Sequence, residues 1–169
     1  MKKLLLLLLV ISYSCMSSNI IVVQSSSPNL SKSDYKLALI DSESSEIVKA
    51  IDVAEDLNKA SHWFLSDSGK FFIFYIDQRG TKLGRINIYK SSDLTLITSI
   101  ETQKLILNKI SKQPQLLKIS NDDTKLLFLT ELKRKQAELN IFNITENKLD
   151  KSFKVSDSIE YIKLLGSNL

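Results

Sequence analysis

The chain has 169 residues, with 23 lysines and arginines against 19 aspartates and glutamates, and 43% of its residues are hydrophobic. These proportions argue against collagen, a coiled coil or general disorder. Cys15 is the only cysteine and His62 the only histidine, which excludes a zinc site built from these residue types. Neither a phosphate-binding glycine loop nor a nucleophile elbow is present in the sequence. We therefore predict no catalytic residues, no cofactor and no metal.

The first fourteen residues have the form of an export signal. Lys2 and Lys3 precede eight uninterrupted apolar residues, 4–11. This length matches the apolar core of a secretory signal peptide and is too short to span a bilayer, which takes roughly 20 residues. Removal of both lysines leaves 21 basic against 19 acidic residues. The basic run 133–135 is expected to be a solvated loop, so no nucleic-acid partner is predicted.

Small residues lead to Cys15, in the order Ser12-Tyr13-Ser14-Cys15. This arrangement resembles the lipobox of bacterial lipoproteins, in which the cysteine is lipidated and becomes the new N-terminus. The resemblance implies a lipid anchor at Cys15 in the cell envelope. It favours the outer membrane slightly, because the next two residues lack the aspartate of the inner-membrane sorting signal. Ser12 and Ser14 also satisfy the small-x-small rule of the ordinary signal peptidase, so a secreted protein without an anchor stays an alternative.

Residues 15–33 are predicted to be a lipidated cysteine followed by a polar tether, and residues 34–169 a folded domain. Four apolar residues, Ile20 to Val23, interrupt the tether. They are either an edge strand or part of the linker. No disulfide can form with a single cysteine, so the domain must be held together by its core.

Three segments of the remainder have the pattern of a β-hairpin, with short alternating strands joined by turn residues. They lie at 35–51, 85–100 and 138–153. Two continuous apolar runs, Phe71 to Ile76 and Leu126 to Leu129, stand in front of the second and third hairpins. A continuous apolar strand is covered on both faces, whereas an alternating strand has one wet face. The pattern predicts small sheets stacked side by side.

The same motif occurs twice at a fixed spacing, which indicates a repeat architecture. Ser66 and Ser120 are 54 residues apart, and Ile88 and Ile141 are 53 residues apart. We assign turn-stabilising roles to Ser66, Gly69, Ser120 and Asp122, since serine and aspartate bond nearby backbone amides and glycine tolerates a positive φ. The second turn is expected to be one residue longer than the first and less well served by Asp123 and Thr124.

The segments 65–70, 77–80 and 86–89 read Leu-Ser-Asp-Ser-Gly-Lys, Asp-Gln-Arg-Gly and Ile-Asn-Ile-Tyr. In this order they resemble the WD40-like propeller repeats of the TolB carboxy-terminal domain and related envelope proteins. The second copy matches through Ser120, Asp122, Lys125 and residues 139–142, without the motif's proline and glycine. The resemblance covers residues 34–165. It implies an all-β fold of four-stranded antiparallel blades and is almost silent on function.

Residues 34–169 hold about 2.5 such repeats, whereas closed propellers have about 4–8 blades. The ring is therefore predicted to be incomplete. Three explanations stay open: assembly of copies in which 159–165 supplies a strand to a neighbour, truncation of a longer ancestor, or an open stack with capped ends. Two connectors are assigned less firmly. Asp52–Glu55 has a capping-box spacing that indicates a helix, and Thr102–Ile110 fits either a strand or a helix.

We predict a non-catalytic envelope lipoprotein that presents a propeller-like module for protein contacts, with an envelope protein or a second copy as partner. The apolar faces of the terminal sheets are the expected contact surface. The first alternative is a protein that binds or hydrolyses a small ligand or glycan, with His62, Asp67 and Asp77 as weak candidate contacts. The second is a degenerate fragment without activity.

Overall fold

A computed structural model describes residues 19–26, 34–54, 61–77, 81–107, 114, 116–132 and 136–156. Within these ranges all regular structure is β, in three antiparallel sheets and no helix. Sheet 1 has the order β1 (Asn19–Ser26), β2 (Asp34–Asp41), β3 (Ile47–Ala54). Sheet 2 has the order β4 (Ser61–Leu65), β5 (Phe71–Asp77), β6 (Leu83–Lys90), β7 (Leu96–Gln103). Sheet 3 contains β8 (Leu117–Ile119), β9 (Lys125–Glu131), β10 (Gln136–Asn143), β11 (Lys148–Ser156).

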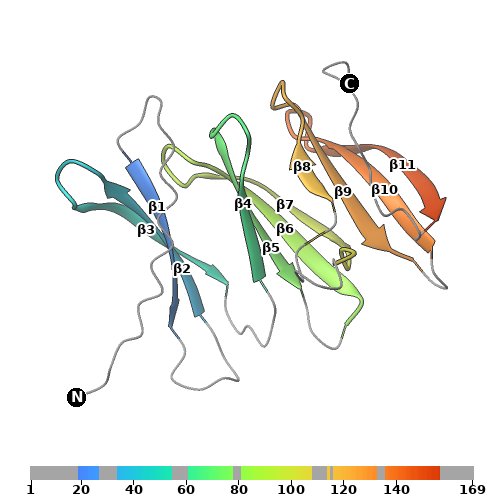
Figure 1. Ribbon diagram of the computed structural model, residues 1–169, viewed down its shortest axis with the longest axis horizontal. Helices are drawn as coiled ribbons and strands as arrows, with labels where there is room; N and C mark the ends of the chain where they lie inside the picture. The colour runs from blue at the N-terminus through green and yellow to red at the C-terminus, as the bar shows by residue number, and fades with distance from the viewer. Residues whose placement is uncertain are drawn as a thin grey trace.

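The three sheets stand side by side along the long axis of the molecule (Figure 1). None closes on itself, which confirms the prediction of an all-β, incomplete propeller-like stack. The range 34–169 contains ten of the described strands, β2 to β11, which equals the predicted 2.5 four-stranded blades, and β1 adds a strand from before this range. There are three sheets, and sheet 1 has three strands because the position held by β4 and β8 in the other two is not filled by a described strand.

The core consists mainly of two layers, one on each side of sheet 2. Sheets 1 and 2 enclose a cluster that includes Leu37, Leu39, Phe72 and Phe74. Sheets 2 and 3 enclose a second cluster, in which Ile73 and Tyr75 of β5 meet residues of β9 and β10. Alternate residues of β5 thus enter different clusters, and both faces of this strand are buried. The continuous apolar run Phe71 to Ile76 is therefore explained, as predicted, by burial of both faces of the strand.

A third cluster lies on the far face of sheet 3. Leu127, Leu129 and Ala137 are buried there, with Leu116 and Ile106 of the connecting segment packed against them. The centre of this face is therefore already covered.

The hairpins β2–β3, β6–β7 and β10–β11 are copies of one local structure. Each contains a register shift just before its turn, at Leu39/Ile40, Ile88/Tyr89 and Ile141/Phe142. Each turn also places one non-glycine residue at positive φ, namely Ser45 at 60°, Leu94 at 53° and Asn147 at 51°. A turn of this kind followed by a bulge gives a hairpin the strand twist that a small sheet needs.

The turn β4–β5 and the turn β8–β9 are equal in length, so the expected extra residue is wrong. The Ser66 Oγ accepts a hydrogen bond from the Phe71 amide at 3.1 Å, and the Ser120 Oγ accepts one from the Lys125 amide at 3.0 Å. Asp123 takes the place of Gly69, with φ of 62° against 74°. Aspartate tolerates this conformation better than most residues. The expectation fails because β9 begins at Lys125, one residue before the apolar run that starts at Leu126.

The helical connector expected at Asp52–Glu55 is wrong for its described part, because Asp52 to Ala54 continue β3. Val53 packs into the cluster between sheets 1 and 2, while Asp52 pairs with Lys36 of β2 at 3.3 Å. Alternate burial along a strand explains the pattern better than a helix. The segment Thr102–Ile110 is extended in its described part: it ends β7 and then forms isolated bridges at Leu105 and Leu107.

The first strand begins inside the range assigned to the tether. All eight residues of β1 pair with β2, from Asn19 opposite Asp41 to Ser26 opposite Asp34. Ile20 to Val23 therefore form a strand at the edge of sheet 1 rather than a linker. Their partners on β2 are apolar as well, which explains why an apolar group interrupts a polar stretch. Cys15, the export signal, the basic run 133–135 and residues 159–165 lie outside the described residues.

Candidate functional site

Two of the three candidate ligand contacts lie on the same side of sheet 2. His62 is opposite Tyr75 in the β4–β5 register, and Asp77 follows two residues later on β5. Asp67 lies at the opposite end of these strands, in the exposed β4–β5 turn, where it pairs with Lys118 at 2.9 Å. The structure therefore brings His62 and Asp77 together and separates Asp67 from them.

His62 is half-buried and pairs with the buried ring of Tyr75. Its ring stacks on Tyr75 with 6.2 Å between centroids and 15° between planes, and its Nε2 is buried without a hydrogen-bond partner among the described residues. Burial lowers the pKa of His62, and the negative charge of Asp77 opposes this change. Burial also raises the pKa of Tyr75 to about 12. Burial thus favours the neutral imidazole and the neutral phenol at this end of the sheet.

Tyr75 ties sheet 2 to the segment that leads to sheet 3. Its hydroxyl accepts a hydrogen bond from the Leu105 amide at 3.0 Å. Its ring lies directly over Gly84 of β6, where an added Cβ would come within 2.7 Å of a ring carbon. Gly84 is therefore required by this close approach of the tyrosine ring.

Asp77 and Lys104 form an ion pair behind this aromatic pair. Asp77 is 4% exposed, and its Oδ2 lies 2.9 Å from the Lys104 Nζ, while its Oδ1 has no partner among the described residues. The Lys104 backbone also joins the two sheets, because its amide donates to the Lys82 carbonyl and its carbonyl accepts from the Glu131 amide. The ion pair therefore holds the lysine at the junction of sheets 2 and 3.

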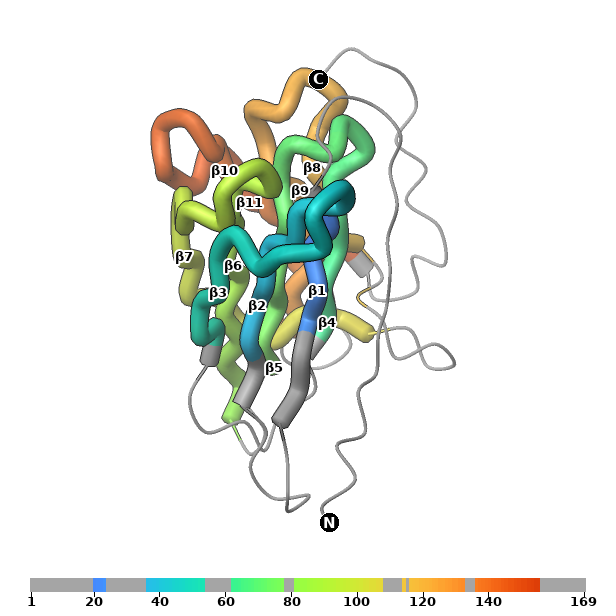
Figure 2. The backbone as a smooth tube through the Cα atoms, turned by 90° about the vertical axis from the view of Figure 1, so that its left-hand side faces the viewer, coloured from blue at the N-terminus to red at the C-terminus, as the bar shows by residue number. Residues whose placement is uncertain are grey.

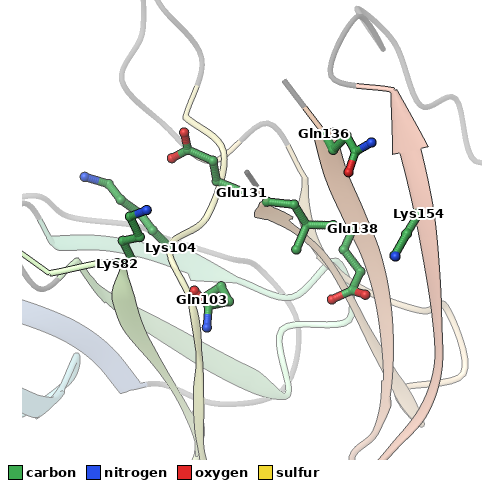
Figure 3. Close-up of a pocket in the computed structure, with 8 residues that line it drawn as sticks. Lys82, Gln103, Lys104, Glu131, Gln136, Glu138 and Lys154 are labelled. Carbon is green, nitrogen blue, oxygen red and sulfur yellow. The ribbon is translucent and has the colours of Figure 1, made fainter. Parts of the chain in front are cut away.

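Lys104 borders a pocket of about 610 Å³ between these two sheets (Figure 3). Small-molecule sites commonly have volumes of about 300–1,000 Å³. Sheet 2 and the segment after it supply Lys82, Gln103 and Lys104, and sheet 3 faces them with Glu138 and Lys154 (Figure 3). The remaining lining residues are Glu131, Leu132 and Gln136. The lining of the pocket thus carries charges of both signs and the two amide side chains of Gln103 and Gln136.

Sequence reasoning named Asp77 but missed the pocket beside it. Lys82, Glu138 and Lys154 read in the sequence as ordinary charged residues of alternating strands. A signal was available in the repeat spacing, because Glu138 and Lys154 stand 53 residues after Arg85 and Glu101. That comparison places two charge pairs at equivalent positions. It does not reveal that the pair Glu138 and Lys154 borders a pocket.

The turn residues form a second group of polar contacts, at the other end of sheets 2 and 3. Ser66 and Ser120 bond the backbone of their own turns, and Asp122 accepts hydrogen bonds from Ser120 and Thr124. Hydrogen bonds to these donors lower the pKa of Asp122. Gly69 adopts positive φ with open space around it. All four residues thus lie where they shape the turns.

The described residues contain no group of three or more histidine, cysteine, aspartate or glutamate side chains placed to hold a metal ion. In the same part of the chain, no helix has the length and apolar character needed to cross a bilayer.

No family model matches the sequence, and no curated protein matches it either. Among solved structures, the β-propeller domain of the Trilobed protease from Pyrococcus furiosus, which has an open velcro topology, superimposes with a TM-score of 0.56 and 13% identity. The match covers 88% of this chain and 43% of that one. An acylaminoacyl peptidase from Pyrococcus horikoshii matches with a TM-score of 0.53 and 11% identity, over 83% of this chain and 23% of that one.

TolB from Acinetobacter baumannii is similar at a TM-score of 0.40 and 15% identity, over 78% of this chain and 29% of its own, a level that does not establish a shared fold. The chain thus spans less than half the length of each of these structures. The first two matches confirm the propeller part of the predicted resemblance. The chain has a β-propeller-like fold of three open sheets.

Proposed function

We propose that the chain is a non-catalytic lipoprotein of the bacterial envelope that presents its propeller-like module to a protein partner. The partner is another envelope protein or a second copy. The proposal joins the lipobox-like start at Cys15 to a surface feature of the described strands.

The carrying observation is a row of exposed apolar side chains on the outermost strands. Ile47 of β3, Leu96 of β7 and Leu149 of β11 are 65%, 49% and 53% exposed. Each is paired with the residue that follows the register shift of its hairpin, so the three occupy equivalent positions. Val48 and Phe153 add exposed apolar surface to the same strands. The outer strands β3 and β7 lie on one side of the molecule and β1 and β4 on the other (Figure 2).

A repeated row of this kind differs from scattered surface leucines, which need no explanation. Neighbouring stacked sheets lie about 10 Å apart, so equivalent positions on three successive sheets extend over about 20 Å. The sequence predicts contact through the apolar faces of the terminal sheets. The centre of the far face of sheet 3 is buried, and exposed apolar side chains stand along the outer strands.

The non-catalytic part of the proposal rests on the only histidine. His62 stacks on Tyr75 with its Nε2 buried, which is a poor position for a general base. Two structural neighbours are the β-propeller domain of a protease and a peptidase, but likeness of fold at 11–13% identity carries no activity with it.

The test is capture of partners from envelope extracts by the intact protein and by the triple variant Ile47→Ser, Leu96→Ser, Leu149→Ser. The double variant Lys49→Ser, Lys151→Ser serves as control, because it changes exposed residues on two of the same strands. We expect a discrete partner, or a second copy, to be recovered with the wild type and the control and lost with the triple variant. Equal recovery with all three proteins, or none with any, would refute the proposal.

A further inference from the structure

Sheets 1, 2 and 3 carry a cross-strand charge pair at the same position of their hairpins. Lys36 and Asp52 face each other in sheet 1, Arg85 and Glu101 in sheet 2. In sheet 3 the pair is Glu138 and Lys154, with the charges exchanged between the strands. Directly opposed side chains of an antiparallel pair have Cβ atoms about 4.5–5.5 Å apart, close enough for an ion pair to form.

Only two of these pairs are closed. The Lys36 Nζ lies 3.3 Å from the Asp52 Oδ1, and the Arg85 Nε lies 2.6 Å from the Glu101 Oε1. Glu138 and Lys154 make no ion pair within 4.0 Å with each other or with another described residue. The open pair is also the one that lines the pocket.

The facing wall of the pocket supplies further positive charge. Lys82 and Lys104 belong to this wall, and Lys104 is already held by Asp77. Lys82 has no ion-pair partner among the described residues. Gln103 and Gln136 contribute amide groups that both donate and accept hydrogen bonds. The pocket therefore offers two carboxylates, Glu131 and Glu138, and one ammonium, Lys154, on sheet 3, and the Lys82 ammonium across from them.

We propose that this pocket binds a free α-amino acid with an acidic side chain. The ammonium group of such a ligand would pair with Glu138 and its α-carboxylate with Lys154, which restores the ion pairing that the other two sheets make internally. Its side-chain carboxylate would pair with Lys82 on the opposite wall. Hydrogen bonds between charged groups are the stronger ones, and a partly enclosed pocket strengthens them further. This inference is independent of the proposed protein contact, which involves the outer strands.

The test is a titration with L-glutamate of the chain from Met16 onward, which carries no lipid. Binding is measured by calorimetry and by the shifts of amide signals in NMR spectra. We expect saturable binding, with shifts centred on Lys82, Gln103 and Glu138. N-acetyl-L-glutamate lacks the ammonium charge, and L-glutamate α-methyl ester lacks the α-carboxylate. Each should bind at least about tenfold more weakly, since each loses one charged hydrogen-bonded pair.

Variants at the pocket and at the equivalent site of sheet 2 separate binding from folding. Glu138→Gln and Lys154→Gln should each weaken L-glutamate binding about tenfold and keep the unfolding midpoint of the wild type. The double variant Arg85→Gln, Glu101→Gln removes the equivalent closed pair and should leave binding unchanged. Absence of saturable binding at millimolar L-glutamate, equal binding of the blocked ligands, or full affinity in Glu138→Gln would each overturn the proposal.

Discussion

The Asp123 carboxylate accepts a hydrogen bond from the Ser68 hydroxyl, 55 residues earlier in the chain, at 2.7 Å between Oγ and Oδ1. Its other oxygen lies 2.9 Å from the Lys70 Nζ. Asp123 stands at the position that Gly69 holds in the preceding repeat. The residue that departs from the glycine of the motif thus connects its own turn to the equivalent turn of the neighbouring sheet.

This connection predicts different stabilities for two substitutions at Asp123. Asp123→Ala loses both contacts and keeps a non-glycine residue at positive φ, so we expect the free energy of unfolding to fall by about 1–2 kcal/mol. Asp123→Gly loses the same contacts but removes the backbone strain, and should be the more stable of the two. Urea denaturation of both variants measures the difference. If Asp123→Ala is as stable as Asp123→Gly, the positive φ at this position does not strain a non-glycine residue, and the prediction is contradicted.

Gly84 gives a second prediction, from close packing. In Gly84→Ala the new Cβ would meet the Tyr75 ring at 2.7 Å, so the ring or the strand must move. Overpacking of this kind costs about 1–3 kcal/mol. Thermal or urea unfolding should show the loss, and Ser92→Ala in an exposed turn is a control that should stay within about 0.5 kcal/mol of wild type. A wild-type midpoint for Gly84→Ala would contradict the described contact.

The sequence predicts the stacked sheets well, because burial on both faces and hairpin alternation leave a direct trace in residue order. Phe71 to Ile76 illustrate this, with neighbours entering different clusters. The helix expected at Asp52 is wrong because a capping spacing is a local signal, and tertiary packing of Val53 overrides it. The fold beyond these elements depends on contacts between distant residues, which residue order does not carry.

The candidate site is less predictable for the same reason. His62 and Asp77 come together through the register of β4 and β5. This register could have been predicted if the length of the β4–β5 turn had been known. The pocket depends on how sheets 2 and 3 approach each other at Lys104, and no local pattern encodes this. The row of Ile47, Leu96 and Leu149 requires three bulges at equivalent positions, which short turns rich in serine do not reveal.

The ion pair of Asp77 with Lys104 predicts a large effect of one substitution. Lys104→Met leaves the carboxylate of Asp77 buried without its charge partner. Loss of one partner of a buried pair costs about 3–5 kcal/mol, and we expect the lower value because Lys104 is about one-third exposed. Asp77→Asn added to Lys104→Met should recover part of the loss in a denaturation experiment. An additive double variant would show that the two charges do not interact.

The half-buried side chain of His62 predicts a pH dependence of stability. Burial holds the pKa of His62 below its ordinary value of 6.5, so the unfolded chain takes up a proton at a higher pH than the folded chain does. The contribution of His62 is therefore complete above pH 6.5 and is lost as the pH falls below that value. Between pH 8 and pH 5 the wild type should lose more unfolding free energy than His62→Gln. Equal losses in both proteins would show that His62 does not contribute.

Cys15 predicts the location of the protein. If the lipobox-like start is processed as proposed, the expressed protein should incorporate labelled palmitate and sediment with membranes. Cys15→Ser should lose both properties and appear in the soluble exported fraction. Cys15→Ser that still sediments with membranes after a salt wash would contradict the lipid anchor, and unlabelled soluble wild type would indicate the ordinary signal peptidase instead.

The claim that the outer strands form a contact surface is tested most directly by photo-cross-linking in living cells. A photoreactive residue is placed at Leu96, in the middle of the exposed row. In a control protein it is placed at Lys118 on β8, at the edge of sheet 3 opposite β11. The proposal predicts one discrete cross-linked product for position 96 and none of that mass for position 118. No product at position 96, or the same product at both positions, would contradict it.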